Sequence, residues 1–238
     1  MKCSLTYVAL FLVFVGCAKR SSDSKSDETE APAPKLVPLV SRHMRAGHID
    51  FVPFDRIPNL DKYPYREEQL MVPEGTTNIA LNKPVSSSCN NPTRGELGMI
   101  TDGAMMYMRD SQQWHHADVE LEAGIQYITI DLNALYSVYA VRFWHCYPMN
   151  PVYFDIIVQT ANDPEFTRNV HILFNNDHDD SIGLGAGTDN NYIEYPWGKL
   201  VHGNGIKVRY IRLYSNGNWA HDRNHYAEVE VYGMPAME

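Results

Sequence analysis

The chain has 238 residues, of which 44% are hydrophobic and 11% aromatic, and its formal net charge at pH 7 is −9. This length accommodates one or two domains, and the apolar content is sufficient for one sizeable core. The acidic balance argues against a nucleic-acid partner, because proteins that bind phosphate backbones carry basic patches.

The N-terminus has the pattern of an export signal. Lys2 precedes an apolar stretch from Leu5 to Val15, which is shorter than the ~20 residues that a membrane-spanning helix needs. Phe14-Val-Gly-Cys17 resembles the cleavage box of bacterial lipoproteins, in which the cysteine is lipidated, although leucine is usual where Phe14 stands. We expect residues 1–17 to be a lipoprotein signal peptide that ends in the lipidated Cys17. A plain secretory peptide cut elsewhere is the alternative.

Two segments of different composition follow the signal peptide. Residues 18–35 are rich in Ser, Asp, Glu, Lys and Pro, which bury too little apolar surface to offset chain entropy, so we expect a disordered tether. Residues 36–77 contain several aromatic residues and five prolines but show neither helical nor strand periodicity. We expect them to form an irregular extension that packs on the outside of the next domain. Only the lipid would attach the protein to the membrane, at a bacterial outer membrane or cell surface.

From residue 78 onward, short β-type runs are separated by loops rich in Asn, Asp and Gly. Gln126 to Leu132 alternates, with Ile128, Ile130 and Leu132 on one face of a strand. Further strands are expected at residues 138–144, 153–160, 170–174, 192–195, 206–215 and 227–232. About eight short strands with turn signals, and no long amphipathic helix, indicate an all-β jelly-roll sandwich over residues 78–233, followed by a tail at 234–238.

Ordered motifs run through this part of the chain. It opens with Asn78-Ile-Ala-Leu-Asn-Lys-Pro-Val85 and closes with Glu228-Val-Glu-Val-Tyr-Gly233. Between them lie Ile100-Thr-Asp-Gly103, Trp114, Tyr127-Ile-Thr-Ile-Asp-Leu132, Val138-Tyr-Ala-Val141 and Arg209-Tyr-Ile-Arg-Leu213. In order and spacing they resemble a coagulation-factor type C (discoidin-like) domain, which implies a galactose-binding-like jelly roll. That family includes bacterial sugar-binding modules and animal phospholipid- or receptor-binding domains, so it implies the fold more firmly than the ligand.

The resemblance places the ligand surface on loops at one end of the barrel. These are residues 89–96, 105–118, 145–153 and 216–224. Aromatic faces there would stack on a sugar ring, and polar groups would exchange hydrogen bonds with its hydroxyls. The candidate ligand-binding residues are Arg109, His116, His145, Tyr147, Trp219 and His221. The alternative for Tyr147 and Trp219 is that they close the core. We expect a sugar rather than a lipid, because only three methionines near residue 106 suggest an apolar, lipid-inserting loop.

The resemblance also implies a structural calcium ion, which many sugar-binding relatives hold between the Asp-Gly loop and the last strand. The predicted ligands are the carboxylates of Asp102 and Glu228 and the carbonyls of Met99, Ala104, Tyr107 and Ala227. Oxygen ligands of this kind suit calcium. The alternative is that Asp102 caps a turn and Glu228 is a solvated strand residue. Residues 175–180 offer another acidic loop, although such loops are usually just solvated.

The chain has four cysteines. Cys3 would leave with the signal peptide and Cys17 would carry lipid, which leaves Cys89 and Cys146 in an exported domain. The family's layout places both in loops at the same end of the barrel, which implies a disulfide between them. Two free thiols are the alternative.

The sequence shows no clear catalytic motif. Gly183 to Gly187 lacks the spacing of a phosphate-binding loop, and His145-Cys146 has no identifiable partner set. We therefore expect a non-catalytic carbohydrate-binding module on a bacterial surface lipoprotein. Its partners would be a glycan or polysaccharide and, in one version of this hypothesis, a carbohydrate-active enzyme. The alternative is a metal-dependent enzyme or an accessory subunit of a polysaccharide-degrading system.

Overall fold

The computed structural model describes residues 33–40, 42, 54–62, 66–89, 91–104, 108–110, 113–115, 118–145 and 152–236. The chain divides into a unit of residues 1–33 and a compact unit, Pro34–Glu238. The predicted signal peptide, the lipidation site Cys17 and all but the last three residues of the predicted tether lie outside the described residues. The described ranges contain no helix with the length and hydropathy to cross a bilayer.

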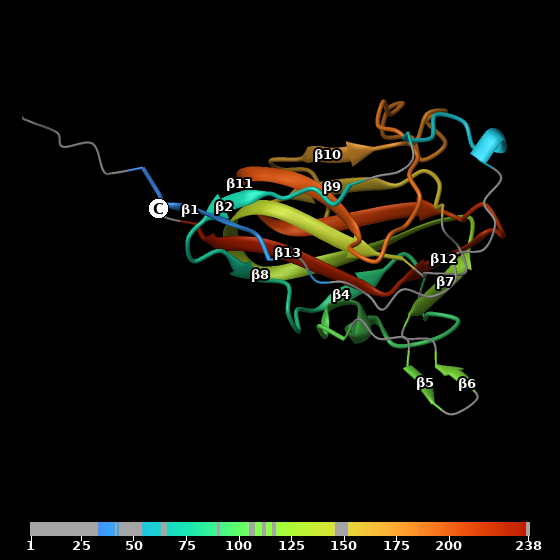
Figure 1. The fold of residues 1–238 in the computed structure, drawn as a ribbon, viewed down its shortest axis with the longest axis horizontal. Coiled ribbons are helices and arrows are strands. Elements are labelled where there is room, and N and C mark those ends of the chain that lie inside the picture. The colour runs from blue at the N-terminus through green and yellow to red at the C-terminus, as the bar shows by residue number, and fades with distance from the viewer. Residues whose placement is uncertain are drawn as a thin grey trace, which may run out of the picture. The chain divides into compact units, whose positions relative to one another are not determined.

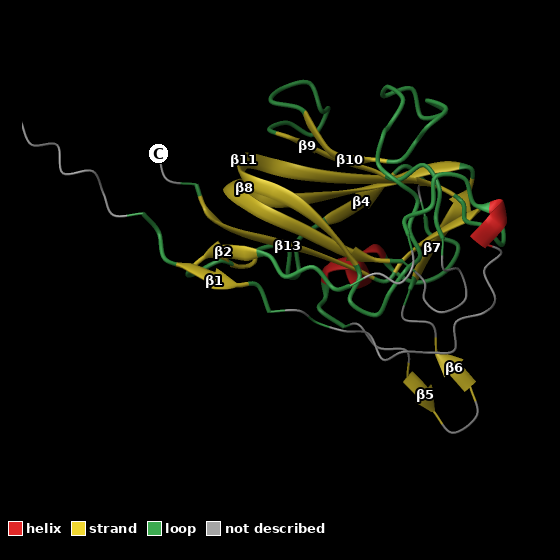
Figure 2. Cartoon of the chain, turned by 45° about the horizontal axis from the view of Figure 1, so that its top comes forward, coloured by secondary structure: helices red, strands yellow, loops and turns green. Residues whose placement is uncertain are grey.

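The regular structure of the described residues is almost entirely β-strand, joined by long loops, and Figure 2 shows only two short 3-10 helices among them. These helices are η1 (Phe54–Arg56) and η2 (Leu97–Thr101). The strands are β1 (Leu36–Pro38), β2 (Met71–Pro73), β3 (Thr77–Asn78), β4 (Val85–Ser87), β5 (Met108–Asp110), β6 (Gln113–His115), β7 (Val119–Ala123), β8 (Ile125–Trp144), β9 (Ile157–Ala161), β10 (His171–Asn175), β11 (Lys199–Asn216), β12 (Arg223–Tyr226) and β13 (Glu228–Pro235).

Two long antiparallel strands, β8 and β11, organise the main sheet (Figure 1). The first half of β8 lies between β4 and the second half of β11, and β9 and β10 follow beyond β11. The second half of β8 lies between the first half of β11 and β13, and β3 pairs with β13. The long strands therefore pass from one layer to the other. This arrangement confirms the predicted all-β sandwich.

The continuity of β8 differs from the sequence prediction, which had two strands at residues 126–132 and 138–144. Asn133 adopts a left-handed φ of 70°, which asparagine tolerates better than most residues. In the opposite strand, the register shifts between Val208 and Tyr210. The chain therefore bends here without reversing direction, and the two predicted strands are one.

A second predicted strand, at residues 192–195, is absent from the described structure. Asn191 makes an isolated bridge to Leu60, and the next three residues have no strand partner. Tyr192 and Ile193 are nevertheless buried, because they pack into hydrophobic clusters as part of a loop. The predicted strand at residues 192–195 is therefore wrong, because the run is a buried loop.

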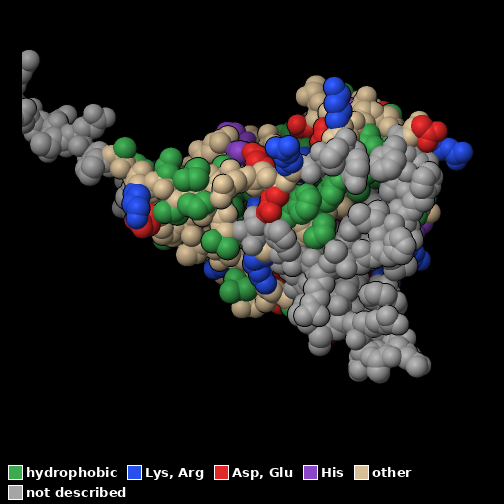
Figure 3. Space-filling model, in the orientation of Figure 1, with side chains coloured by type: hydrophobic (Ala, Val, Ile, Leu, Met, Phe, Trp, Pro, Cys, Tyr) green, Lys and Arg blue, Asp and Glu red, His purple; other side chains and the backbone are tan. Residues whose placement is uncertain are grey.

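The core lies between the two layers. Ile128, Ile130 and Leu132 have no exposed surface, which confirms the predicted alternation. They share one cluster with Val141 and Phe143 from the second half of β8. Full burial of such a side chain contributes about 1.5–3 kcal/mol. On the outside, Figure 3 shows acidic and basic side chains interspersed over the described part of one face.

The predicted extension at residues 36–77 contains regular structure. Its β1 and β2 pair antiparallel, with Val37 opposite Val72. Val72 and the neighbouring Leu39 pack against Ala140 of β8 and Tyr232 of β13. In Figures 1 and 2 this β1–β2 ribbon and the β7–β12 ribbon lie toward opposite ends of the main sheet.

Candidate ligand-binding site

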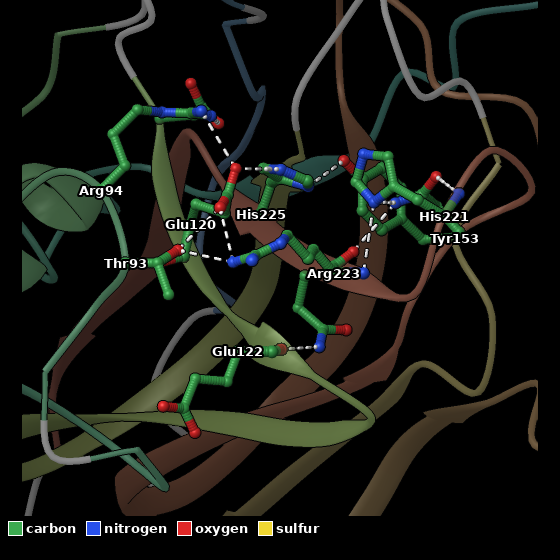
Figure 4. Close-up of polar contacts among 11 residues, drawn as sticks. Thr93, Arg94, Glu120, Glu122, Tyr153, His221, Arg223 and His225 are labelled. Carbon is green, nitrogen blue, oxygen red and sulfur yellow. Dashed lines mark hydrogen bonds and ion pairs between the residues drawn. The ribbon is translucent and has the colours of Figure 1, made fainter.

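One end of the sandwich carries a two-stranded ribbon formed by β7 and β12. Glu120 lies opposite His225 in its register. The loop that precedes η2 runs beside β7, where the backbone N–H groups of Thr93 and Arg94 both donate to the carbonyl of Glu120. Three segments that are distant in sequence therefore place their polar side chains together (Figure 4).

The Glu120 carboxylate is the centre of this cluster. One of its oxygens accepts from Thr93 Oγ1 at 2.7 Å and from Arg223 at 3.0 Å. The other accepts from Arg94 at 3.0 Å and from His225 Nε2 at 3.3 Å. Burial alone would raise the pKa of Glu120, but the Thr93 hydrogen bond and the Arg94 and His225 interactions hold it below its usual value. Glu120 is therefore ionised at neutral pH.

Arg94 connects this centre to the interior. Its guanidinium also donates to Asp118 at 2.6 Å, and the Asp118 side chain is fully buried. Arg94 itself is 38% exposed, and Arg223, on the other side of Glu120, is 46% exposed. Both guanidinium groups are thus held in place by carboxylates and remain open to solvent.

His225 is buried and bonded on both ring nitrogens. Burial lowers its pKa to about 4, although the charges of Asp118 and Glu120 act in the opposite direction. The neutral ring donates its Nε2 proton to ionised Glu120, so Nδ1 accepts from the Tyr153 hydroxyl at 3.1 Å. The neutral His225 ring therefore links Tyr153 to Glu120 through one hydrogen bond on each of its nitrogens.

His221 is the exposed member of the group. Its ring packs edge-on against His225, with 5.2 Å between the ring centroids. Its Nδ1 accepts from the backbone N–H of Arg223 at 3.2 Å. When the imidazole is neutral, its proton therefore lies on Nε2, which is available as a donor. The structure thus places His221 at the surface, and its ligand-binding role stays a prediction.

The turn that carries His221 is fixed by Asn224. The buried Asn224 amide accepts from the backbone N–H of Gly217 and donates to the carbonyls of Glu122 and Gly124. Gly217 has a φ of 72°, and a Cβ there would lie 2.9 Å from the backbone of Asp222. Glycine is required at this position, and the loop closes tightly beside β12.

Two other predicted ligand residues point inward. His145 has no exposed surface; its Nδ1 donates to Glu194 at 2.5 Å and its ring stacks on Tyr153 with 4.2 Å between centroids. We therefore correct its predicted role from ligand contact to support of Tyr153. Trp219 is half-buried and packs in a cluster that includes Val152. This is the core-closing alternative recognised from the sequence.

The remaining predicted ligand residues are not placed by the structure. Arg109 lies in β5, but its side chain is outside the described residues, as are His116 and Tyr147. Glu120 and His225 were missed because the loops alone were considered. The alternation Val-Glu-Leu-Glu from residue 119 was the available signal, since it places Glu120 on the polar face of a strand.

The predicted calcium ligands lie at the junction of η2 and β13. Both oxygens of the buried Glu228 carboxyl accept from the Gly103 N–H at 3.2 Å, and exposed Asp102 accepts from the Ala104 N–H at 2.7 Å. Burial, with the nearby charges of Glu230 and Asp102, raises the pKa of Glu228 to about 9. Asp102 thus caps a turn, but Glu228 is not solvated. A buried carboxyl surrounded by acidic groups fits a cation.

The other predicted ligands of that ion are carbonyl groups. Met99 belongs to η2, Ala227 links β12 to β13, and Tyr107 lies outside the described residues. One positive charge already faces this junction. Arg42 of the extension donates to Glu230 at 2.5 Å and to the Gly103 carbonyl at 2.6 Å.

A second acidic group, which could hold a metal ion, lies near the start of β9. Oxygens of Asp155, Asp177 and Asp179 lie within 4.8 Å of one another. Ser181 Oγ donates to both Asp155 and Asp177, and Asn216 donates to Asp155 at 2.9 Å. Burial and the two neighbouring carboxylates raise the pKa of Asp155. The sequence singled out residues 175–180 but could not add Asp155, which reaches them only through folding.

Cys89 is a free, buried thiol in this structure, with its sulfur 3.6 Å from the Ser87 hydroxyl oxygen. Cys146 lies outside the described residues. The disulfide between them stays a prediction.

No protein-family model and no curated protein matches the chain. Among solved structures, a family 89 glycoside hydrolase from Clostridium perfringens is similar at 17% identity and a TM-score of 0.45, over 66% of this chain and 15% of the hydrolase. A chitosan-binding module from Paenibacillus sp. IK-5 is 17% identical with a TM-score of 0.44, over 66% of this chain and 99% of the module. A fucose-binding module from Streptococcus pneumoniae is 17% identical with a TM-score of 0.45, over 66% and 97% of the two chains. Both full-length matches are carbohydrate-binding modules.

Proposed function

We propose that the protein is a non-catalytic carbohydrate-binding module whose ligand contacts the loops around β7 and β12. The observation that carries this proposal is the exposed pair His221 and Arg223, held beside the Glu120 cluster. A sugar hydroxyl both donates and accepts hydrogen bonds, so its binding site needs donors and acceptors close together. The two arginines and His221 supply donors, and the Glu120 carboxylate, whose oxygens already accept four hydrogen bonds, holds the arginines in position.

Preorganisation supports the same conclusion. Arg94 and Arg223 are already paired with carboxylates, and their partners come from a ribbon rather than from free loops. Such side chains lose little further freedom when a ligand binds, which reduces the entropic cost of association. Their charges are also largely compensated by Glu120 and Asp118. This balance favours a hydroxyl-rich ligand over a strongly charged one at this end of the sandwich.

A glycan array tests the proposal. The full chain should bind a limited set of glycans, and Glu120→Gln together with Arg223→Gln should remove the signals. Glu122→Gln is a matched control, because Glu122 lies on the same strand and Figure 4 shows its carboxylate pointing away from the cluster. Hydrolysis of a bound glycan by the purified chain would instead support the alternative, a polysaccharide-degrading enzyme.

We also propose that Cys17 is lipidated and attaches the module to a bacterial outer membrane or cell surface, where a carbohydrate-active enzyme is a candidate partner. The sequence supports this through the apolar signal that ends at Cys17 and the polar segment that follows it. Mass spectrometry of the mature N-terminus is the test. A diacylated or triacylated Cys17 is expected, and an unmodified N-terminus beyond Cys17 would contradict the anchor.

The structural ion that we propose is calcium, bound by Asp102 and Glu228 between η2 and β13. The support is that three carboxyl groups, including the buried Glu228, face the single guanidinium of Arg42, and a divalent cation would compensate the remaining negative charge. The group formed by Asp155, Asp177 and Asp179 is the alternative position. Calcium would fix the loop after η2 to the last strand.

A further inference from the structure

A hollow of about 430 Å³ lies between the extension and the sandwich, formed by side chains that take no part in the Glu120 cluster. On the sandwich side it is lined by Arg142 of β8, Lys199 of β11 and the loop that contains Tyr192, Tyr195 and Trp197. On the extension side it is lined by Asp61, Lys62, Arg66 and Glu68. Four basic and two acidic side chains thus face one another in a protein whose net charge is −9.

Lys199 places a cation in this hollow. Its ammonium lies 4.6 Å from the centroid of the Tyr192 ring and 4.7 Å from that of Phe174. Within the described part of the chain, no group accepts a hydrogen bond from it. Burial lowers the pKa of Lys199, and the charges of Asp61, Asp189, Glu194 and Glu68 act in the opposite direction. The aromatic faces attract the ammonium, but they do not accept conventional hydrogen bonds from its three donors, and none of the described residues supplies such an acceptor.

Arg142 adds a second cation behind Lys199. Its side chain is only 1% exposed, and its guanidinium donates to the Trp197 carbonyl at 3.3 Å. Its guanidinium also forms an ion pair with the Glu67 carboxylate at 3.6 Å. The Arg142 Nε has no hydrogen-bond partner among the described residues. Arg142 therefore adds a buried positive charge behind Lys199, although Glu67 compensates part of it.

Aromatic rings form the wall beside the two cations. Tyr195 and Trp197 stack with 4.4 Å between their centroids and 15° between their planes. The turn between them is fixed, because Gly198 donates to the Tyr195 carbonyl and a Cβ on Gly198 would lie 2.6 Å from Trp144. Trp144 also donates its indole N–H to the Pro196 carbonyl at 3.0 Å. A rigid aromatic wall suits a ligand with an apolar ring face, such as a sugar.

We propose that this hollow is a second binding site, which takes an anionic saccharide with a carboxylate or a sulfate ester. The anion pairs with the Lys199 ammonium, and the sugar ring lies against the Tyr195–Trp197 wall. Asp61 and Glu68 at the rim accept hydrogen bonds from the ligand's hydroxyls. This site is independent of the Glu120 cluster, so the protein would contact two positions of a polysaccharide and gain affinity through avidity.

Calorimetry with three oligosaccharides of equal length tests the proposal on the full chain. The probes are trigalacturonate, a sulfated galactan trisaccharide and neutral cellotriose. We expect the carboxylated or the sulfated probe to bind at least tenfold more tightly than cellotriose, and whichever is bound identifies the anion. Lys199→Met keeps the apolar stem against the rings and should weaken binding at least tenfold. Lys207→Met, on the same strand, is the matched control and should change nothing.

Two further variants keep the result interpretable. Arg66→Gln changes an exposed side chain of the rim and should weaken binding at least twofold even if Lys199→Met does not fold. His221→Ala should leave the affinity for the anionic probe unchanged, which separates this site from the proposed glycan site around β7 and β12. Equal binding of all three probes, binding of none, or unchanged affinity in both folded Lys199→Met and Arg66→Gln would overturn the proposal.

Discussion

Glu120 and His225 face each other across the β7–β12 ribbon, and the imidazole Nε2 lies 3.3 Å from the carboxylate oxygen. The two residues are 105 positions apart, so the contact exists only in the folded chain. His225 is also hydrogen-bonded to Tyr153, and the Tyr153 ring stacks on the buried ring of His145, so the pair is connected to the interior. It anchors the exposed arginines and His221 to the rigid part of the sandwich.

The buried imidazole makes stability depend on pH. The pKa of His225 is about 4 in the folded protein and about 6.5 when unfolded, so the unfolded chain binds more protons between these values. His225 therefore does not reduce the free energy of unfolding above pH 6.5. As the pH falls from 6.5 to 4, it reduces this free energy progressively, by about 3 kcal/mol at most. Urea unfolding of the wild type and of His225→Gln, measured at pH values from 4 to 7, should show a smaller loss in the variant.

The comparison with a variant is necessary because Glu228 changes the free energy of unfolding with pH in the opposite direction to His225. Its raised pKa of about 9 makes the folded state bind more protons above pH 4.5, so its contribution falls as the pH increases. The difference between wild type and His225→Gln removes this effect. His171→Gln, at the exposed start of β10, is the control. Parallel stability curves for wild type and His225→Gln would contradict the assigned pKa.

Removal of the Glu120 charge should destabilise the ribbon. Glu120→Gln weakens the pairing with Arg94, Arg223 and Thr93 at once. We expect a loss of about 1 to 2 kcal/mol in the free energy of unfolding, since the arginines are partly solvated and the carboxylate is nearly buried. Chemical denaturation provides the measurement. An equal loss in Glu122→Gln would show that the effect is not specific to the cluster.

Calcium should raise the melting temperature if it binds the native state alone. At a free concentration of 100 times Kd the expected stabilisation is about 2.7 kcal/mol. Asp102→Ala should abolish the shift if the ion lies beside Glu228, whereas Asp179→Asn should abolish it if the ion lies beside Asp155. Differential scanning calorimetry with chelator and with calcium distinguishes the two. Identical melting temperatures of the wild type with chelator and with calcium would contradict calcium binding.

Trp219 should affect stability more directly than ligand affinity. Its ring packs in the cluster formed with Ile57, Val152 and Ile193, so Trp219→Ala leaves a cavity between the extension and the loops. We expect a loss of about 2 to 3 kcal/mol, because the ring is only half-buried. Thermal unfolding measures this loss. Unchanged stability of Trp219→Ala together with weaker glycan binding would instead show that Trp219 contacts the ligand.

The sequence predicted those parts of the fold that depend on local periodicity. Alternation placed Ile128, Ile130 and Leu132 in the core, since the period of a strand is two residues. It could not show that the chain continues through Asn133, because the bend depends on the shifted register of the opposite strand. Likewise, the buried loop at Tyr192 has the composition of a strand but forms no β-ladder with the described residues.

The candidate site was predictable only in its location. The loops at residues 89–96 and 216–224 contain Arg94 and His221, which contact Glu120 and His225 respectively. The alternation from residue 119 places Glu120 on a polar strand face, but its contact with His225 depends on the pairing of β7 with β12 and could not be predicted from sequence. His145 was misjudged because a histidine after a strand can point either way, and here the carboxylate of Glu194 holds it inside.

The most direct test of the central claim is calorimetry with a glycan identified on the array. We predict that His221→Ala and Arg223→Gln each weaken binding about tenfold, which corresponds to about 1.4 kcal/mol. The controls His171→Ala and Arg168→Gln change an exposed histidine and arginine elsewhere and should leave the affinity unchanged. Circular dichroism should show an intact fold in all four variants. Unchanged affinity in both His221→Ala and Arg223→Gln, with the fold intact, would contradict glycan binding at the β7–β12 ribbon.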